Sequence, residues 1–224
     1  MSRSMKYPLL SWKYLSIPLL VFTTSLAFAQ NIEDEKLEGN KYFDGFHVGL
    51  DAGFQNIFGG AFINNVDVLA QESGLVLGVS AGYRRQLIKD RLLIGAELQW
   101  AFSDGDLAQT HLDYQIIYKN QAQFGYGVNI GVVLGKRKKV LLFAYGKETK
   151  RDFDIAIVNI DGASFSQKDS QVFFRYGLGV EISLYKRFNL AGAIGGVKTD
   201  YGDVETNMDL DDKLDFNLRI VYQF

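Results

Sequence analysis

The last twelve residues of the chain, Lys213 to Phe224, read KLDFNLRIVYQF and decide its fold class. One parity of this stretch is wholly apolar and aromatic, and it holds Leu214, Phe216, Leu218, Ile220, Tyr222 and Phe224. The other parity is mostly polar and holds Asp215, Asn217, Arg219, Val221 and Gln223. Because a β-strand sends alternate side chains to opposite faces, this segment has one apolar and one polar face. Its length is close to the roughly 9–11 residues that a tilted strand needs to cross a bilayer core.

The same alternation recurs in seven earlier segments. These segments are residues 46–55, 75–84, 92–102, 124–135, 141–148, 172–184 and 189–199. Short connections (85–91, 136–139 and 185–188) alternate with long loops (56–73, 103–122, 152–170 and 200–212). The alternative for the second long loop is that its sides, residues 111–118, extend the strands above the membrane. In lipid every backbone N–H and C=O needs an internal partner, and strands meet that need only in a closed sheet. The sequence therefore predicts an all-β fold, an eight-stranded antiparallel up-and-down transmembrane β-barrel over residues 44–224.

Bulky residues occupy the predicted outer face of most strands, and Gly, Ser, Asn and charged residues occupy the inner face. This pattern disfavours the alternative of a soluble barrel with an apolar interior. Segment 141–148 alternates less cleanly, and there we expect Leu141, Phe143 and Tyr145 to face outward and Glu148 inward. In 189–199 many residues are small, so the facing of this strand is left open.

The first 29 residues read as a cleaved signal peptide. Basic residues come first, an apolar stretch follows from Leu15 to Leu26, and Ala27-Phe28-Ala29 forms a cleavage site. The alternative is a membrane-anchoring helix, but the apolar run is short and Pro18 interrupts it, whereas a spanning helix needs about 20 apolar residues. Residues 30–43 are polar and predict a short, flexible periplasmic lead-in to the barrel.

Composition agrees with a barrel and narrows the classes of partner. The chain has 23 Gly, 14% aromatic residues and only 2 Pro, which suits a transmembrane barrel better than a helical domain. Its formal net charge is −2, which argues against nucleic acid as a partner. The chain has no Cys, so it can form no disulfide and carries no lipoprotein anchor.

The chain resembles the small eight-stranded, porin-like outer-membrane barrels, the group that contains the transmembrane domain of outer-membrane protein A. The specific motif is the carboxy-terminal assembly signal, which Asn217, Tyr222 and Phe224 match, while Arg219 stands where Gly is usual. The resemblance implies a Gram-negative outer membrane, both termini in the periplasm, and insertion by the barrel assembly machinery. It also implies contact with outer-membrane lipid and lipopolysaccharide. The peptidoglycan-binding role of the family does not carry over, because no such domain follows the barrel.

Eight strands enclose a lumen only wide enough for side chains. We therefore expect charged inward residues to pair and fill the lumen, namely Asp51, Arg84, Glu97, Glu148, Arg175, Glu181 and Arg219. Asp51 and Arg219 lie halfway along the first and last strands, which become neighbours on closure, so we predict that they pair with Glu97 nearby. Lys147 and Arg151 are expected to face outward at the outer rim, where they would contact lipopolysaccharide phosphates.

Catalytic and metal-binding patterns are weak. His47 and His111 are the two His residues, and neither lies in the His-x-Ser pattern of lipid A deacylases. Two His without Cys fall short of a metal site. The acidic residues of 200–212 lack the ordered spacing of a calcium loop, and the basic turn 136–139 could also contact anionic lipid. We therefore predict no enzymatic activity, no cofactor and no metal.

The sequence leaves three classes of function open. The first is a structural or surface-interaction barrel that binds an unknown ligand through four extracellular loops, because loops on a rigid scaffold commonly carry binding. The second is a narrow, low-conductance porin-like channel. The third is a lipid-modifying outer-membrane enzyme that would use His47 or His111.

Overall fold

The computed structural model describes residues 41–63, 66–103, 106–111, 114–159, 164–185, 187–199 and 214–224. The expected signal peptide, most of the lead-in and the acidic loop 200–212 lie outside these described residues. The strands are β1 (Gly45–Ile63), β2 (Val66–Leu87), β3 (Leu92–Ser103), β4 (Leu107–His111), β5 (Tyr114–Leu134), β6 (Val140–Asn159), β7 (Ser164–Tyr185), β8 (Phe188–Thr199) and β9 (Leu214–Gln223). Among the described residues, no helix is long and apolar enough to cross a bilayer.

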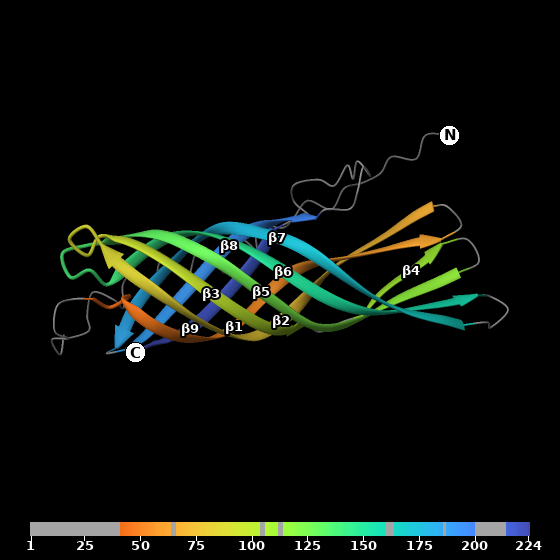
Figure 1. Ribbon diagram of the computed structural model, residues 1–224, viewed down its shortest axis with the longest axis horizontal. Helices are drawn as coiled ribbons and strands as arrows, with labels where there is room; N and C mark the ends of the chain where they lie inside the picture. Colours follow the sequence, from red (N-terminus) through yellow and green to blue (C-terminus); the bar gives the residue numbers. More distant parts are fainter. Residues whose placement is uncertain are drawn as a thin grey trace, which may run out of the picture.

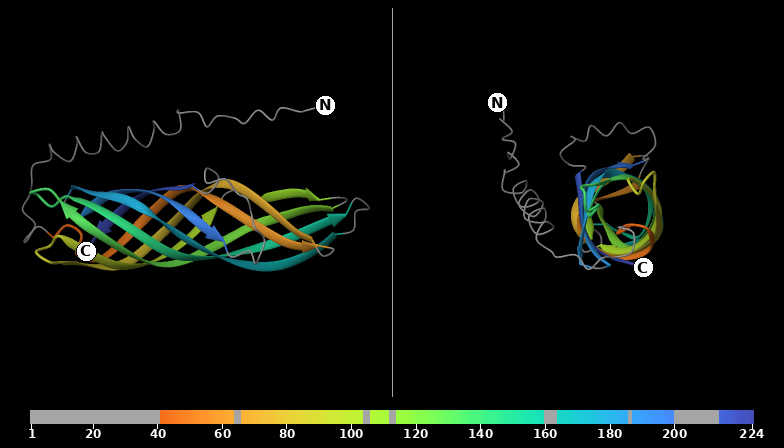
Figure 2. Two further views of the ribbon diagram at one scale, coloured as in Figure 1. Left: turned by 90° about the horizontal axis from the view of Figure 1, so that it is seen from above. Right: turned by 90° about the vertical axis from the view of Figure 1, so that its left-hand side faces the viewer.

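The strands form one closed antiparallel barrel (Figures 1 and 2). The order in the sheet is β3-β2-β1-β9-β8-β7-β6-β5-β4, and an additional pairing of β3 with β5 closes it. β3 and β4 both pair with β5, so they occupy one position of the wall in succession. The wall therefore has eight strand positions, and the predicted eight-stranded antiparallel barrel is confirmed.

The two ends of the barrel differ in their connections. At one end, the turn end, tight turns join β2 to β3, β5 to β6 and β7 to β8. Phe224 lies at the same end, where its N–H donates a hydrogen bond to the carbonyl of Phe46 at 2.9 Å. At the other end, the hairpin end, β1–β2, β4–β5 and β6–β7 form hairpins. Figure 1 shows the turn end on the left and the hairpin end on the right.

Several strands are about twice as long as a bilayer requires. β1, β2, β5, β6 and β7 have 19, 22, 21, 20 and 22 residues, against roughly 9–11 for a spanning strand. The predicted long loops at 56–73 and 152–170 are therefore wrong, because most of their described residues continue the strands. In 103–122 the alternative is correct, because β4 and β5 extend over most of the described residues of 111–118. We call residues 56–73, 107–120 and 151–171 the extension, and the rest of the wall the band.

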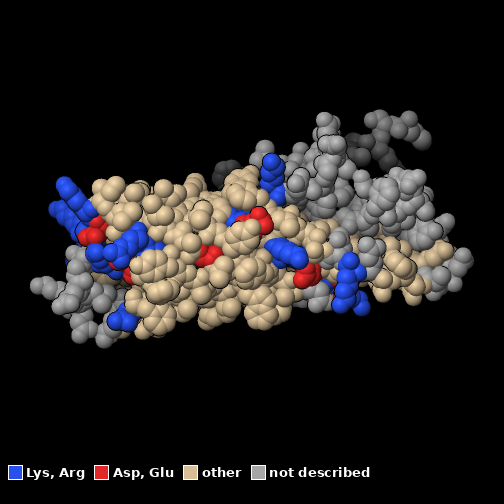
Figure 3. Space-filling model, viewed as in Figure 1, with Lys and Arg blue, Asp and Glu red and all other residues tan. Residues whose placement is uncertain are grey.

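The outer face of the band is apolar. Large hydrophobic side chains such as Leu50, Leu98, Val128 and Leu178 are more than half exposed there. Figure 3 shows a mostly uncharged surface next to the charged side chains of the turn end, with a few charged side chains near the middle of the view. Aromatic residues mark its two borders, with Phe46, Tyr83, Phe188, Tyr222 and Phe224 toward the turn end and Phe54, Trp100, Phe102, Phe124, Tyr126, Phe174 and Tyr176 toward the hairpin end. This is the surface of a membrane-spanning barrel, with aromatic rings at both interfaces.

The predicted facing of β6 is reversed. Leu141, Phe143 and Tyr145 face the lumen, whereas Glu148 faces outward and interacts with Tyr126. The reason lies in the neighbouring strands, where glycines leave space for the β6 side chains. A Cβ added to Gly179 would overlap the Phe143 ring, and one added to Gly177 would lie 2.8 Å from the Tyr145 ring.

This reversal corrects three of the predicted roles. Lys147 and Arg151 are buried on the inner face, at 7% and 0% exposure, so they do not face lipopolysaccharide. Glu148 is not a lumen residue. The facing of β8, which the sequence left open, is also defined: Asn189 and Val197 are buried inside, and Phe188 and Ile194 face outward.

Polarity inverts along the strands at the border between the band and the extension. In the extension the inner face carries Ile116, Tyr118, Phe153 and Ile155, all buried, while exposed Lys119, Asp152 and Lys168 cover the outer face. The pairing of β5 with β6 shifts register between Asn120 and Gln123. This β-bulge moves the buried residues of β5 from even to odd numbers and therefore lies where the polarity changes.

Candidate functional site: the lumen

Three layers of ion pairs cross the lumen of the band. The middle layer joins the first and last strands, because Asp51 and Arg219 are direct partners in the register of β1 and β9. Arg219 donates from Nε to Asp51 Oδ1 at 2.5 Å, and from its two terminal nitrogens to the Glu97 oxygens at 2.7 and 3.1 Å. Asn217 donates a further hydrogen bond to Asp51 at 3.1 Å. One guanidinium thus holds two carboxylates from β1 and β3, the arrangement that strand parity predicts.

The second layer lies toward the turn end and spans the barrel from β2 to β7. Arg84 forms a bidentate pair with Glu181, with both N–H···O distances at 2.6 Å. Gln223 accepts hydrogen bonds from Arg84 at 3.0 and 2.8 Å, and Asn189 donates to Glu181 at 2.7 Å. Both charges are almost fully buried, and the bidentate geometry with these additional hydrogen bonds offsets part of their desolvation cost.

The third layer lies toward the hairpin end. Arg175 pairs with Asp215 and donates to the backbone carbonyl of Asn56 at 3.1 Å. Asp215 also accepts from the Asn56 N–H at 2.9 Å. The sequence predicted Arg175 as a lumen residue but not its partner Asp215, although the inward parity of Asp215 is the same as that of Arg219.

Two further cations reach into the lumen from β6. Lys147 donates to Gln99 at 2.5 Å, and Arg151 donates to Gln123 and, at 3.0 Å, to Ser103. These neutral acceptors were not predicted, because the facing of β6 was reversed. The inward-facing glycines Gly177, Gly179 and Gly195 are the signal that would have indicated the facing of β6. They leave space in the lumen that large side chains of a neighbouring strand must fill.

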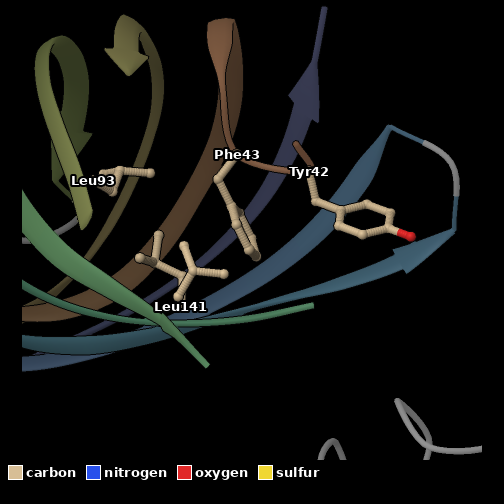
Figure 4. Close-up of a cluster of buried hydrophobic side chains, with 5 residues drawn as sticks. Tyr42, Phe43, Leu93 and Leu141 are labelled. Carbon is tan, nitrogen blue, oxygen red and sulfur yellow. The ribbon is translucent and has the colours of Figure 1, made fainter. Parts of the chain in front are cut away.

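An apolar plug closes the lumen at the turn end. Phe43 and Tyr42, from the end of the expected flexible lead-in, are buried against Leu93, Val133 and Leu141. Figure 4 shows the side chains of Leu93 and Leu141 on the same side of Phe43, with Tyr42 on its other side. The Phe43 N–H donates to Gln86 at 3.1 Å, and the Arg84 guanidinium lies 5.7 Å from the Phe43 ring centre.

Five further apolar side chains are buried toward the hairpin end. They are Ile116, Tyr118, Phe153, Ile155 and Phe173, each at most 4% exposed. Tyr118 and Phe153 make an edge-to-face contact with ring centres 6.3 Å apart. We call this group the hairpin-side cluster. The charged layers therefore lie between two apolar groups.

Little space remains between these groups. A cavity of about 50 Å³ lies in the lumen, lined by residues of all three layers, among them Glu97, Arg175 and Glu181, and by Lys147. A water molecule needs about 10–15 Å³ by this measure, so the cavity accommodates a few waters and no larger solute.

The described residues of the lumen offer no metal-binding group. No group of three or more His, Cys, Asp or Glu side chains converges there. His47 is buried at 2% exposure, and its Nδ1 has no hydrogen-bond partner in the described part of the chain. The side chain of His111 lies outside the described part of the structure.

The residues of the predicted assembly signal occupy both faces of β9. Asn217 faces the lumen, and Tyr222 and Phe224 lie on the apolar face with ring centres 5.0 Å apart. Recognition by the assembly machinery stays a prediction. We expect deletion of Phe224 to abolish heat-modifiable folded protein in outer-membrane fractions, and normal levels would contradict that role.

Comparisons with known proteins agree with this architecture. A family model described as the outer membrane protein beta-barrel domain matches residues 16–224. None of the curated proteins matches the chain.

Among solved structures, the chain is similar to Ail, the attachment invasion locus protein of Yersinia pestis, with 10% identity, a TM-score of 0.44, and coverage of 81% of this chain and 100% of Ail. Neisserial surface protein A is 13% identical with a TM-score of 0.44, covering 81% of this chain and 98% of that one. The N-terminal barrel of Pseudomonas aeruginosa OprF is 12% identical with a TM-score of 0.43 and the same coverage.

Proposed function

Because the chain belongs to the outer membrane protein beta-barrel domain family, we propose that it is a structural or surface-interaction protein of the outer membrane. In this proposal the lumen is a filled scaffold that conducts no solutes. The extension and the connections at the hairpin end form the binding surface. The protein acts without enzymatic chemistry, cofactor or metal.

The observation that carries this proposal is the double closure of the lumen. The plug fills the turn end, the hairpin-side cluster fills the other side, and three ion-pair layers lie between them. A diffusing solute would have to displace both apolar groups and separate buried charges. Breaking one buried pair alone typically costs roughly 3–5 kcal/mol.

The extension supports the surface role. About nine residues of β6 lie beyond the band, from Arg151 to Asn159, and at roughly 3.3 Å per residue with a strand tilt near 40° they rise roughly 20 Å above the membrane. Asp152 and Asp154 lie on their outer face, and Phe153 and Ile155 are buried on their inner face, so in this proposal the extension is a packed platform in water. Binding residues on such a platform lose little entropy when they engage a partner.

This proposal places the turn end in the periplasm and the hairpin end outside the cell. The chain has no Cys, so single cysteines report orientation cleanly. We expect a membrane-impermeant maleimide to label Lys168→Cys in intact cells, and to label Lys89→Cys only after the outer membrane is permeabilised. The opposite pattern would invert the orientation.

The surface role is tested by site-specific cross-linking in cells. A photo-reactive residue at Lys168, on the outer face of the extension, is expected to capture a specific partner. The same residue at Leu98, on the lipid face of the band, serves as the matched control. Equal capture at both positions, or none at Lys168 under conditions where the protein is displayed, would contradict the role of the extension.

A narrow channel is the second candidate, and the charged lumen with its cavity favours it. The experiment is single-channel recording of the pure protein and of a Tyr42→Ala, Phe43→Ala variant. We expect the wild type to give no unitary conductance. Stable conductance steps from the wild type would overturn the filled-scaffold proposal and favour the channel. Steps from the variant alone would identify the plug as the closed gate of a conduit.

A further inference from the structure

Exposed cations surround the turn end of the barrel. Six exposed Arg and Lys side chains come from β2 and from the three tight turns: Arg85, Lys89, Arg91, Lys136, Arg137 and Arg187. We call this group the basic collar. Figure 3 shows blue side chains gathered at this end of the molecule.

The acidic side chains described at this end are few and already engaged. Asp90 interacts with Lys138 at 3.1 Å and Lys41 at 3.7 Å, neither of which belongs to the collar. Asp44 accepts a hydrogen bond from the Gln86 N–H at 2.6 Å and lies 4.0 Å from Arg85. The turn end therefore carries a clear excess of positive charge among the described residues.

The hairpin end shows no such excess. Its outward charges in the described part of the chain are balanced between four Lys and four acidic residues: Lys119, Lys150, Lys168, Lys198, Asp106, Glu148, Asp152 and Asp154. A general need for solubility would place both signs at both ends. The asymmetry instead indicates a negatively charged partner at the turn end.

The aromatic border fixes the depth of the collar relative to lipid. Phe46 and Tyr83 make an edge-to-face contact at 4.9 Å, and Arg85 donates to the Tyr83 hydroxyl at 3.3 Å. Aromatic rings of this kind lie at the level of lipid headgroups. The collar continues from this border toward water, so it lies at the level of the headgroup phosphates.

The turns also hold the collar in a defined conformation. Ile88, Lys89 and Asp90 all have positive φ, and the Arg91 N–H donates to the Leu87 carbonyl at 3.0 Å. In the β5–β6 turn, Gly135 has a φ of +79°, a conformation that glycine adopts without strain. Cations on such fixed turns are presented to a ligand at low entropic cost.

We propose that the basic collar binds the phosphates of anionic phospholipids in the leaflet that surrounds the turn end. Arg and Lys form charge-assisted hydrogen bonds with phosphate oxygens. A cation close to an anionic membrane surface strengthens binding by a factor of about five. The collar thereby fixes the depth of the barrel on this side, whatever the extension binds.

The test compares lipid affinity in matched charge variants. Dissociation constants for phosphatidylglycerol and phosphatidylcholine are measured by native mass spectrometry on the intact barrel in detergent. The collar variant carries Lys89→Glu, Lys136→Glu and Arg187→Glu. The control variant carries the same charge change at the hairpin end, Lys119→Glu, Lys150→Glu and Lys168→Glu. A neutral collar variant carries Gln at the same three positions and is used if charge reversal impairs folding. Heat-modifiability monitors the folding of each variant.

We expect the wild type and the control to prefer phosphatidylglycerol, and the collar variants to lose that preference by at least about tenfold. High salt should weaken the wild-type preference, because the collar charges are exposed. An unchanged preference in the folded Gln variant, or an equal loss in the control, would overturn the proposal. Inorganic phosphate that displaces the lipid at equal concentration would show a free-phosphate site instead of a lipid surface, and would also overturn it.

Discussion

The band and the extension are built from the same strands but have opposite polarity. In the band, apolar side chains such as Leu98 and Leu178 face outward, and ion pairs such as Arg84–Glu181 face inward. In the extension, Phe153 and Ile155 face inward, and Asp152 and Lys168 face outward. The surrounding solvent explains the difference, because the band contacts hydrocarbon and the extension contacts water. One continuous strand can therefore pass from hydrocarbon into water, provided that its apolar residues change from the outer face to the inner face.

This comparison separates what closes the barrel from what fills it. The wall is held by backbone hydrogen bonds in both regions. Buried charges fill the band, where the outer face cannot carry them. Beyond Arg151, buried apolar side chains such as Phe153 and Ile155 line the inner face of the extension, as in a water-soluble protein. Substitutions that remove a buried charge from the band, or that place a charge on its outer face, should therefore have the largest effects on stability.

The largest expected effect is the loss of the central cation of the band. Arg219→Ala removes the partner of both Asp51 and Glu97 and should destabilise the barrel by roughly 3–5 kcal/mol, less if lumenal water hydrates the carboxylates. Asp51→Ala should cost less, because Glu97 still pairs with Arg219. Urea unfolding in detergent or lipid measures both variants.

The double variant tests whether these two residues interact. If Asp51 and Arg219 act as a pair, the double variant loses less than the sum of the single losses. Strictly additive losses would contradict a direct interaction across the β1–β9 seam.

Placing a charge on the outer face should distinguish the two regions directly. Leu98→Arg, in the middle of the band, should destabilise the barrel by roughly 2–4 kcal/mol in a lipid bilayer. Ser166→Arg, on the exposed outer face of the extension, should change stability by less than about 0.5 kcal/mol. Unfolding in lipid vesicles gives both values, and similar costs at the two positions would place the membrane border elsewhere.

The facing of β6 can be tested through a neighbouring glycine. Gly179→Ala places a methyl group against the Phe143 ring and should cost roughly 1–3 kcal/mol through overpacking. Gly192→Ala is the matched control, because its Cβ would lie 3.6 Å from the nearest atom, a side-chain atom of Leu218. Phe143→Leu should relieve the cost of Gly179→Ala. Thermal unfolding measures these stabilities. An equal loss of stability in Gly179→Ala and Gly192→Ala would argue that Phe143 does not occupy this space.

The smallest expected effect concerns a water-exposed ion pair at the turn end. A hydrogen bond from Lys138, together with the charges of Lys138 and Lys41, lowers the pKa of Asp90 below its ordinary value of 3.8. A depressed pKa stabilises the folded state above the ordinary value, and this stabilisation is lost as the pH falls through the folded-state pKa.

The difference in urea midpoint between wild type and Asp90→Asn should therefore be present at neutral pH and vanish in strong acid. Asp106→Asn, at an exposed position of the opposite end, controls for the loss of a surface carboxylate. A difference that grows in acid would contradict the sign of this effect.

Much of the fold follows from alternation and connection length. The eight strand positions, the antiparallel closure and the neighbourhood of Asp51 and Arg219 all follow from parity. Most of the extension was interpreted as loops, and only residues 111–118 were considered as a continuation of the strands. The available signal was the alternation of Phe153, Ile155 and Ile157 with more polar residues. This pattern is typical of a strand with one buried face and one face in water.

The lumen was only partly predictable, because side-chain facing depends on neighbours that the sequence does not place. Aromatic residues on β6 suggested an outward face, yet the glycines of β7 and β8 leave space for them inside. Asp215 was missed because it lies at the start of β9, close to residues expected to form a loop. Tyr42 and Phe43 were missed because the segment before them is polar.

The bulge between Asn120 and Gln123 has a consequence for how this protein can change in length. Hairpins above the bulge can gain or lose residues in matched pairs without altering which side chains meet the lipid. A trimmed β6–β7 hairpin that ends at the Phe153–Asp169 pair would keep the register below it. The height of the extension can therefore change independently of the part of the barrel that spans the membrane.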